Sequence, residues 1–237
     1  MLIFIQKHSP YNHISHNILY NFRFQKGVFK IDNISSEFLK QFYDSRVWLY
    51  DTHWLGVPIL KLPSDLFLYQ EMIYELKPDL IIECGTCYGG SALYLASILD
   101  LIGKGHVLTI DIFPQPKRPS HERITYLTAS SVSVTAVQTI LSMRKPDDVI
   151  LVILDSDHSK EHVAKELLLY KSIVTKGSYI IVEDTSINGN PVSPDWGPGP
   201  MEAVEEFLAT NNNFIIDESK HKFFISFNPK GFLKKIK

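Results

Sequence analysis

Acidic residues directly follow two strongly apolar segments of this chain. Residues 149–154 (VILVIL) run into Asp155, and residues 179–182 (YIIV) run into Glu183 and Asp184. Short segments of this kind, rich in β-branched residues, predict strands buried on both faces of a parallel sheet, in which ligands bind beyond the carboxyl ends of the strands. Carboxylates gathered there without a counter-ion would repel one another, whereas oxygen ligands suit a hard divalent cation. We therefore expect three carboxylates to meet in one crevice and to form a metal site.

A glycine-rich segment, residues 83–91 (ECGTCYGGS), joins the first predicted strand of the sheet to a helix. Glycines let the backbone turn tightly and approach a ligand, and the free N–H groups at the start of a helix point outward. The segment therefore predicts a nucleotide-type cradle. Its glycines at 85, 89 and 90 do not follow the G-x-G-x-x-G dinucleotide pattern. The acid at its entry, Glu83, suits a ligand with positive charge better than a pyrophosphate.

Asp111 ends the second predicted strand, one strand–helix–strand period after Glu83. At this place an acid accepts hydrogen bonds from ribose hydroxyls in nucleotide-binding βαβ units. The alternative is that Asp111 caps the turn before Pro114. The register of Glu83, Gly85 and Asp111 favours the ribose contact, and both interpretations remain open.

The elements that must position these residues alternate between strand and helix patterns from about residue 65 onward. The predicted strands lie at 80–82, 106–110, 123–128, 149–154 and 178–182. The predicted helices between them lie at 91–101, 133–143 and 160–174. This order predicts an α/β fold with a parallel sheet and right-handed crossovers. After a helix that begins near Pro200, residues 213–216 and 222–227 are predicted to form an antiparallel hairpin.

The composition indicates one α/β domain with a moderate extension. At 237 residues the chain is long enough to bury a substantial core without disulfides. Its 24 basic and 26 acidic residues nearly balance, which gives no basic footprint for nucleic acid or an anionic membrane surface. No apolar run approaches the roughly 20 residues needed to span a bilayer. We therefore expect a cytoplasmic protein that acts on a small molecule.

Residues 1–64 contain aromatic residues and histidines without steady periodicity. We expect an extension of short helices that covers the substrate cleft as a lid or mediates association into a homo-oligomer. His13 and His16 could bind a metal on one helical face, but the sequence places no Cys or acidic partner beside them. Cys84 and Cys87 have the spacing of a redox pair or of half a zinc site. No second Cys/His pair accompanies them, so the glycine pattern explains this segment better.

Taken together, these motifs resemble the cephalosporin hydroxylase family. The resemblance depends on E-x-G-x-x-x-G-G-S, L-D-S-D-H-S-K-E-H, G-S-Y-I-I-V-E-D-T and G-P-G-P, and it covers about residues 60–228. That family is similar in fold to class I S-adenosylmethionine-dependent methyltransferases and is related to metal-dependent sugar and catechol-type O-methyltransferases. The resemblance implies a Rossmann-like class I methyltransferase fold over residues 65–237, with a mostly parallel seven-stranded sheet and a C-terminal antiparallel hairpin.

The resemblance also implies the cofactors, which are S-adenosylmethionine on the glycine-rich segment and Mg²⁺ on Asp155, Glu183 and Asp184. Catechol-type enzymes have Asp then Asn where this chain has Glu183 then Asp184, so its site is more acidic and the choice of divalent ion stays open. The sequence lacks the H-x-D…H facial triad of iron oxygenases, so we expect methyl transfer rather than hydroxylation. The residues expected to contact S-adenosylmethionine are Glu83, Gly85, Thr86, Tyr88, Gly89, Gly90, Ser91, Asp111, Ser130 and Asp155.

His158, three residues after Asp155, is the candidate catalytic residue. Methyl transfer needs an ionised oxygen nucleophile, and a divalent cation chelated by vicinal hydroxyls lowers the pKa of the attacking one. His158 could take its proton near neutral pH, as the residue in a similar place does in metal-dependent sugar methyltransferases. The alternative is that His158 orients Asp155 or caps the next helix. Asp157 is expected to be the N-cap of that helix.

The loop at residues 185–199 is long enough to act as a lid. Its Trp196 is a candidate stacking platform for a sugar face, and the alternative is that the loop packs on the N-terminal segment. His162, one helical turn after His158, could belong to the same mouth, but an ordinary surface histidine is the preferred interpretation. The basic pair at 117–118 could contact a substrate phosphate, but a solvated loop is the preferred interpretation.

Three functions remain open at the level of sequence. The leading one is an S-adenosylmethionine- and Mg²⁺-dependent O-methyltransferase acting on a hydroxylated small molecule or a sugar unit. The second is a nicotinamide-dependent oxidoreductase on a Rossmann sheet, against which the glycine spacing argues. The third is a non-catalytic nucleotide-binding module of a biosynthetic assembly, because a fold does not determine a function.

Overall fold

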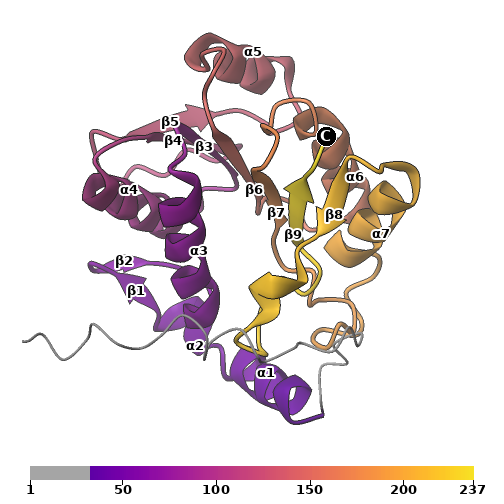
Figure 1. Ribbon diagram of the computed structural model, residues 1–237. Helices are drawn as coiled ribbons and strands as arrows, with labels where there is room; N and C mark the ends of the chain where they lie inside the picture. The colour runs from indigo at the N-terminus through magenta and orange to yellow at the C-terminus, as the bar shows by residue number, and fades with distance from the viewer. Residues whose placement is uncertain (1–32) are drawn as a thin grey trace, which may run out of the picture. The chain divides into compact units, whose positions relative to one another are not determined.

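The computed structural model describes residues 33–237, which form one compact unit (Figure 1). At its centre lies a seven-stranded sheet with the order β5-β4-β3-β6-β7-β9-β8. Strands β3 to β7 are parallel, and β9 is antiparallel to both β7 and β8. These findings confirm the predicted α/β class and the mostly parallel sheet. The strands are β3 (Leu80–Cys84), β4 (His106–Asp111), β5 (Ile124–Thr128), β6 (Ile150–Leu154), β7 (Tyr179–Val182), β8 (Phe214–Ile216) and β9 (Phe232–Lys235).

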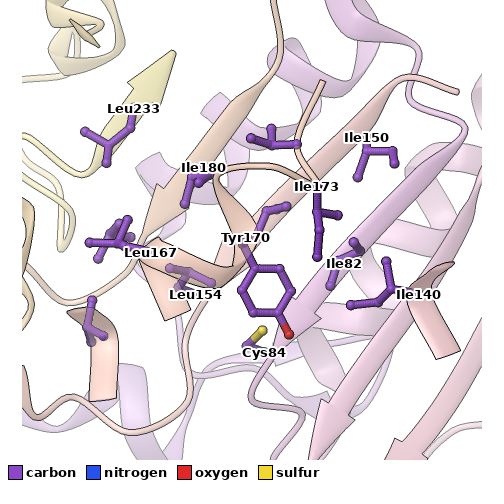
Figure 2. Close-up of a cluster of buried hydrophobic side chains, with 14 of the residues drawn as sticks. Ile82, Cys84, Ile140, Ile150, Leu154, Leu167, Tyr170, Ile173, Ile180 and Leu233 are labelled. Carbon is purple, nitrogen blue, oxygen red and sulfur yellow. The ribbon is translucent and has the colours of Figure 1, made fainter. Parts of the chain in front are cut away.

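Two layers of helices cover the two faces of the sheet (Figure 1). Helices α3 and α4 pack on one face, and α5, α6 and α7 pack on the other. Side chains of β3 alternate between the two layers, as the period of a strand requires. Ile81 belongs to the apolar cluster formed with α3 and α4, and Ile82 belongs to the cluster formed with α5, α6 and α7. Figure 2 shows Tyr170 within the cluster formed with α5, α6 and α7, with its hydroxyl toward Cys84. The helices are α3 (Pro63–Leu76), α4 (Gly90–Ile102), α5 (Val134–Met143), α6 (Lys160–Tyr170) and α7 (Pro200–Thr210).

Strands β3, β6 and β7 are buried along their whole length. This burial explains why their sequences are continuous apolar runs rather than alternating patterns. The register pairs Cys84 with Leu154, and Leu154 with Val182. The polar residues that follow these three strands therefore emerge beside one another at the same edge of the sheet.

Shorter elements precede the sheet in the described chain. They are α1 (Asn33–Ser45), α2 (Val47–Tyr50) and a two-stranded antiparallel pair, β1 (His53–Trp54) and β2 (Val57–Pro58). Leu39 and Tyr43 of α1 form a third apolar cluster with Ile187 and Val192 of the 185–199 loop. This part of the loop therefore packs on α1, which was one of the two alternatives for it. The boundary expected near residue 65 falls inside the compact unit, and His13 and His16 lie outside the described residues.

The second strand of the predicted C-terminal hairpin was wrong in its position. The partner of β8 is β9, whereas Glu218–His221 form a short 3-10 helix, η1, and residues 222–227 form no strand. The apolar Phe227 is typical of a strand, but its ring packs in the third apolar cluster, which contains Leu39 and Tyr43 of α1. The Phe227 N–H donates to Asp65 at 2.9 Å. The chain joins the sheet at β9, directly after Gly231. The backbone approaches β7 so closely there that a Cβ on Gly231 would lie 2.2 Å from the Val182 carbonyl oxygen.

Two further expectations concern membranes and cysteines. Within residues 33–237, no helix has the length and apolar character needed to cross a bilayer. Cys84 is a buried free thiol and Cys87 an exposed one. Cys84 is the last residue of β3, and Cys87 lies in the turn between β3 and α4 that the glycine pattern predicted.

Candidate active site

A cavity of about 920 Å³ lies at the carboxyl ends of β3, β4, β6 and β7. Parts of α1 and of the segments around α2 and β2 also line it, through Tyr43, Trp48 and Lys61. Three predicted site residues, Glu83, Gly89 and Glu183, do not reach its surface. The predicted residues that line it are Gly85, Thr86, Tyr88, Gly90, Ser91, Asp111, Ser130, Asp155, His158 and Asp184.

His158 lies between two of the predicted carboxylates. Its Nε2 is 3.4 Å from Asp155 Oδ1, and its Nδ1 is 3.3 Å from Asp184 Oδ2. The contact with Asp155 has the distance of an ion pair without the geometry of a hydrogen bond. Burial alone would lower the pKa of His158, but Asp184 and Asp155 outweigh it and raise that pKa to about 9. The two carboxylates therefore favour the imidazolium form of His158.

Asp155, His158 and Asp184 also form a group with the donor chemistry of a metal site. One ligand atom from each lies within 4.8 Å of the others, the one such group of three or more found among residues 33–237. Burial raises the pKa of Asp184, and the neighbouring Asp155 raises it further. Two partly exposed carboxylates facing a cavity fit a hard divalent ion, because such an ion would relieve their repulsion.

Glu183 lies behind this group and contacts Lys61. The Lys61 ammonium is 2.9 Å from Glu183 Oε1 and 2.5 Å from Asp155 Oδ2, and the Lys61 side chain is 4% exposed. The Tyr69 hydroxyl donates to the same oxygen of Glu183, and the Asn228 amide donates to Tyr69 at 3.0 Å. Burial alone would lower the pKa of Lys61, but Asp155 and Glu183 raise it well above the usual range.

Lys61 is the main site residue that sequence reasoning missed. It belongs to the segment Val-Pro-Ile-Leu-Lys-Leu-Pro at residues 57–63, where it is the single charged side chain. Lysine is rarely buried unless it is paired. A lone lysine in an apolar run was therefore the signal that a buried acidic partner existed elsewhere in the chain.

Two glycines of the 83–91 segment also have a packing role inside the protein. A Cβ on Gly85, whose φ is +97°, would lie 1.8 Å from the Asp155 carbonyl oxygen, and one on Gly90 would lie 2.1 Å from that of Pro58. The space beside both glycines is therefore occupied by backbone of the protein. Their absence of side chains lets the segment pack against the end of β6 and against β2, which leaves Thr86, Tyr88 and Ser91 to face the cavity.

Asp111 closes the same segment against the end of β4. Its Oδ2 accepts from the N–H groups of Thr86 at 3.1 Å and Cys87 at 2.9 Å, and its Oδ1 accepts from Phe113 N–H at 2.9 Å. Arg118 donates to Asp111 at 3.0 Å and to the Cys87 carbonyl at 2.9 Å. The prediction of a solvated loop is wrong for Arg118, whose side chain is 6% exposed. The capping role of Asp111 is observed, and its side chain also lines the cavity.

Glu83 has a buried carboxylate with one unused oxygen. Its side chain is 1% exposed, Oε2 accepts from the Thr109 hydroxyl at 2.6 Å, and Oε1 has no hydrogen-bond partner. Burial raises the pKa of Glu83 to about 7. A buried acceptor without a partner is costly, and a positive charge in the cavity would favour the ionised form of this carboxyl.

We expect Glu83→Gln to stabilise the protein at about pH 8. The unfolded carboxyl titrates near 4.5 and the folded one near 7, so the folded state of the unmodified protein loses stability as the pH rises through this window. Glutamine does not titrate, and the gain at about pH 8 should be about 1–3 kcal/mol. Denaturant unfolding at about pH 5 and pH 8 measures it, with the exposed Glu122→Gln as control. The same pH dependence in Glu83→Gln and in the unmodified protein would contradict the prediction.

The start of α6 differs from the prediction. Ser159, not Asp157, is the N-cap, and its hydroxyl accepts from His162 N–H at 3.4 Å. Asp157 accepts from Ser159 N–H at 2.8 Å and so supports the turn before the helix. His162 is not an ordinary surface residue, because its Nε2 lies 3.0 Å from the Ser131 hydroxyl and 3.4 Å from Glu166 Oε1, and the residue lines the cavity.

Trp196 places part of the 185–199 loop beside His158. Its indole N–H donates to the His158 carbonyl at 3.3 Å, the two rings are 6.4 Å apart, and the Trp196 side chain lines the cavity while remaining half exposed. Asn188 holds the loop by donating to Glu202 at 2.9 Å and accepting from Gly197 N–H at 3.2 Å. An aromatic face is thus available next to the acidic group.

Comparisons with known proteins identify the family of this chain. The family model for rhamnosyl O-methyltransferase/CmcI matches residues 46–236. A rhamnosyl O-methyltransferase of Mycobacterium tuberculosis (strain ATCC 25618 / H37Rv) is 38% identical over 209 residues, covering 85% of each chain. One of Mycobacterium leprae (strain TN) is 37% identical over 210 residues, covering 85% of this chain and 90% of the relative.

A solved structure of CmcI, described as "Mg-SAM", shares the fold. Its TM-score is 0.60 at 21% sequence identity, and the match covers 78% of this chain and 77% of that one. The predicted resemblance to the cephalosporin hydroxylase family is confirmed by the family match and by the mycobacterial relatives. The chain belongs to the rhamnosyl O-methyltransferase/CmcI family.

Proposed function

We propose that the protein is an S-adenosylmethionine-dependent O-methyltransferase that modifies a hydroxyl of a sugar unit or of a similar hydroxylated small molecule. The observation that carries the proposal is one cavity that joins the glycine-rich segment to Asp155, His158 and Asp184. The names of the mycobacterial relatives support a sugar acceptor. The fold shared with CmcI, together with the "Mg-SAM" description of that structure, supports the cofactors.

The cofactor surface is proposed to be the wall formed by the predicted contact residues. Thr86 and Tyr88 present polar groups from the β3–α4 turn, Ser91 does so from the first turn of α4, and Ser130 from the segment after β5. S-adenosylmethionine carries a sulfonium and an ammonium, and the unused oxygen of Glu83 provides negative charge beside this wall. A pyrophosphate would gain nothing from that carboxylate, which favours S-adenosylmethionine over a nicotinamide dinucleotide.

Asp155, Glu183 and Asp184 are proposed to hold a divalent ion. Asp155 and Asp184 already line the cavity. Glu183 is buried behind Asp155, and the Lys61 ammonium contacts both of these carboxylates. When bound, the ion supplies Lewis acidity, which lowers the pKa of a chelated hydroxyl and fixes its direction. The donor set favours Mg²⁺ or another oxygen-seeking ion.

His158 is proposed to accept the proton of the acceptor hydroxyl. Its ring lies between two carboxylates at the cavity wall, and a divalent ion held by these carboxylates would offset the negative charge that favours the imidazolium. The imidazole would then be neutral, which is the form that accepts a proton. Trp196 beside it offers an apolar face to a sugar ring and keeps water from one side of His158. These residues position and deprotonate a hydroxyl, and the remaining demand is alignment with the methyl donor.

Methyl transfer from labelled S-adenosylmethionine to methyl rhamnoside tests the proposal. We expect label in the sugar when Mg²⁺ is present, and little after treatment with a chelator. Calorimetry should show binding of S-adenosylmethionine and none of NAD. Binding of NAD alone would support the oxidoreductase, and cofactor binding without turnover on any of a panel of sugars and catechols would support the non-catalytic module.

A further inference from the structure

Lys61 brings a buried positive charge to the acidic group from a distant part of the chain. It lies between β2 and α3, and its ammonium contacts Asp155 Oδ2 at 2.5 Å and Glu183 Oε1 at 2.9 Å. Glu183 is 2% exposed and Lys61 is 4% exposed, so little water competes for this contact. Taking such charges out of water is unfavourable unless they are paired, and Lys61 provides the pairing.

We propose that Lys61 competes with the divalent ion for Asp155 and Glu183, and that it thereby sets how tightly the free protein holds the ion. This inference depends on the proposed metal site. Two of the three proposed ligands are the two partners of Lys61. Glu183 is also absent from the group whose ligand atoms lie together, although it directly precedes Asp184 in the chain.

The contacts of Glu183 explain why Lys61 matters for the ion. One oxygen, Oε1, lies 2.9 Å from the Lys61 ammonium and accepts a hydrogen bond from the Tyr69 hydroxyl, so both contacts hold the carboxylate toward Lys61 and α3. Full use of Glu183 as a ligand requires that the ammonium give up this contact. A positive charge so close to the site also opposes a second cation by Coulomb repulsion.

A consequence for the order of binding follows. With Asp155 and Glu183 engaged by Lys61, the free protein should bind the ion weakly. Substrate hydroxyls add oxygen ligands, so the ion should be retained well only when substrate is also present. Lys61 is in this sense a positioning residue, because it acts through the carboxylates.

Binding of Mn²⁺, followed by electron paramagnetic resonance without substrate, tests the competition. Lys61→Met should bind Mn²⁺ at least about tenfold more tightly than the unmodified protein. Lys61→Arg retains the charge and should stay within about threefold. In a Glu183→Gln background, Lys61→Met should gain less than about threefold, because the released ligand is missing. The control is Lys104→Met, which removes a half-exposed lysine paired with Asp79 at 2.7 Å.

A measurement on the unmodified protein covers the case in which Lys61→Met does not fold. The ammonium signal of Lys61 in nitrogen-detected nuclear magnetic resonance, assigned through Lys61→Arg, should shift when Mg²⁺ saturates the site. An unchanged signal, or weaker Mn²⁺ binding by a folded Lys61→Met, would overturn the competition. Absence of Mn²⁺ binding in every variant would also overturn it, whereas methyl transfer that persists with a chelator would leave the methyltransferase proposal standing.

Discussion

Replacing His158 by alanine should lower kcat for methyl transfer by at least about 100-fold, the usual contribution of a positioned general base. The side chain lies between Asp155 and Asp184, and its two charged partners are these carboxylates rather than residues of the glycine-rich segment, so affinity for S-adenosylmethionine should change little. Single-turnover kinetics and calorimetry measure the two quantities separately. The exposed His53→Ala is the matched control, because His53 lies on β1 outside the cavity lining.

The alternative role of His158, orientation of Asp155, predicts a different pattern. An orienting residue would change Mn²⁺ affinity together with kcat, whereas a base would change kcat alone. A His158→Ala protein with full activity would remove the base assignment. Loss of activity that is accompanied by weak Mn²⁺ binding would assign His158 to the support of the ion.

Asp155→Asn should have the second large effect, a fall in Mn²⁺ affinity of at least about 100-fold. Asp155 contacts both cations of the site, Lys61 at 2.5 Å and His158 at 3.4 Å, and its pKa is low because these cations outweigh its burial. Lys61 keeps only Glu183 in the variant, so the free energy of unfolding should also fall by about 1–3 kcal/mol.

Mn²⁺ titration and denaturant unfolding of Asp155→Asn measure the two effects. The exposed Asp147→Asn removes a carboxylate from the same neighbourhood of the chain and should change neither. If Asp155→Asn retains both its Mn²⁺ affinity and its activity, the proposed ligand set is wrong. A loss of stability without a loss of Mn²⁺ affinity would reduce Asp155 to a structural partner of Lys61.

The parallel strands of the sheet could be located in the sequence because the central ones are buried on both faces. Continuous apolar runs such as 149–154 are identified easily, and the acid after each run marks the edge of the sheet. The last strand could not be placed in the same way. Residues 222–227 have strand-like composition, but Phe227 packs in the third apolar cluster. The chain pairs with the sheet again only after Gly231.

The site was predictable where contacts are local in sequence and not where distant segments meet. The position of His158 next to Asp155 follows from their spacing within one turn. The contacts of Lys61 with Asp155, 94 positions away, and of Arg118 with the Cys87 carbonyl depend on the folded arrangement of loops. Similarly, Asp157 and Ser159 are both good caps by type, and only the course of the backbone decides between them.

The path of the chain between β2 and α3 has a consequence for engineering. A shortened protein that begins at Pro63 would keep every strand of the sheet but would lose the ammonium that contacts Asp155 and Glu183. It would also lose Pro58, whose carbonyl packs against Gly90. In a chimaera of two relatives, residues 57–62 should therefore come from the same parent as the sheet. The lysine of this segment then keeps the carboxylates with which it is paired.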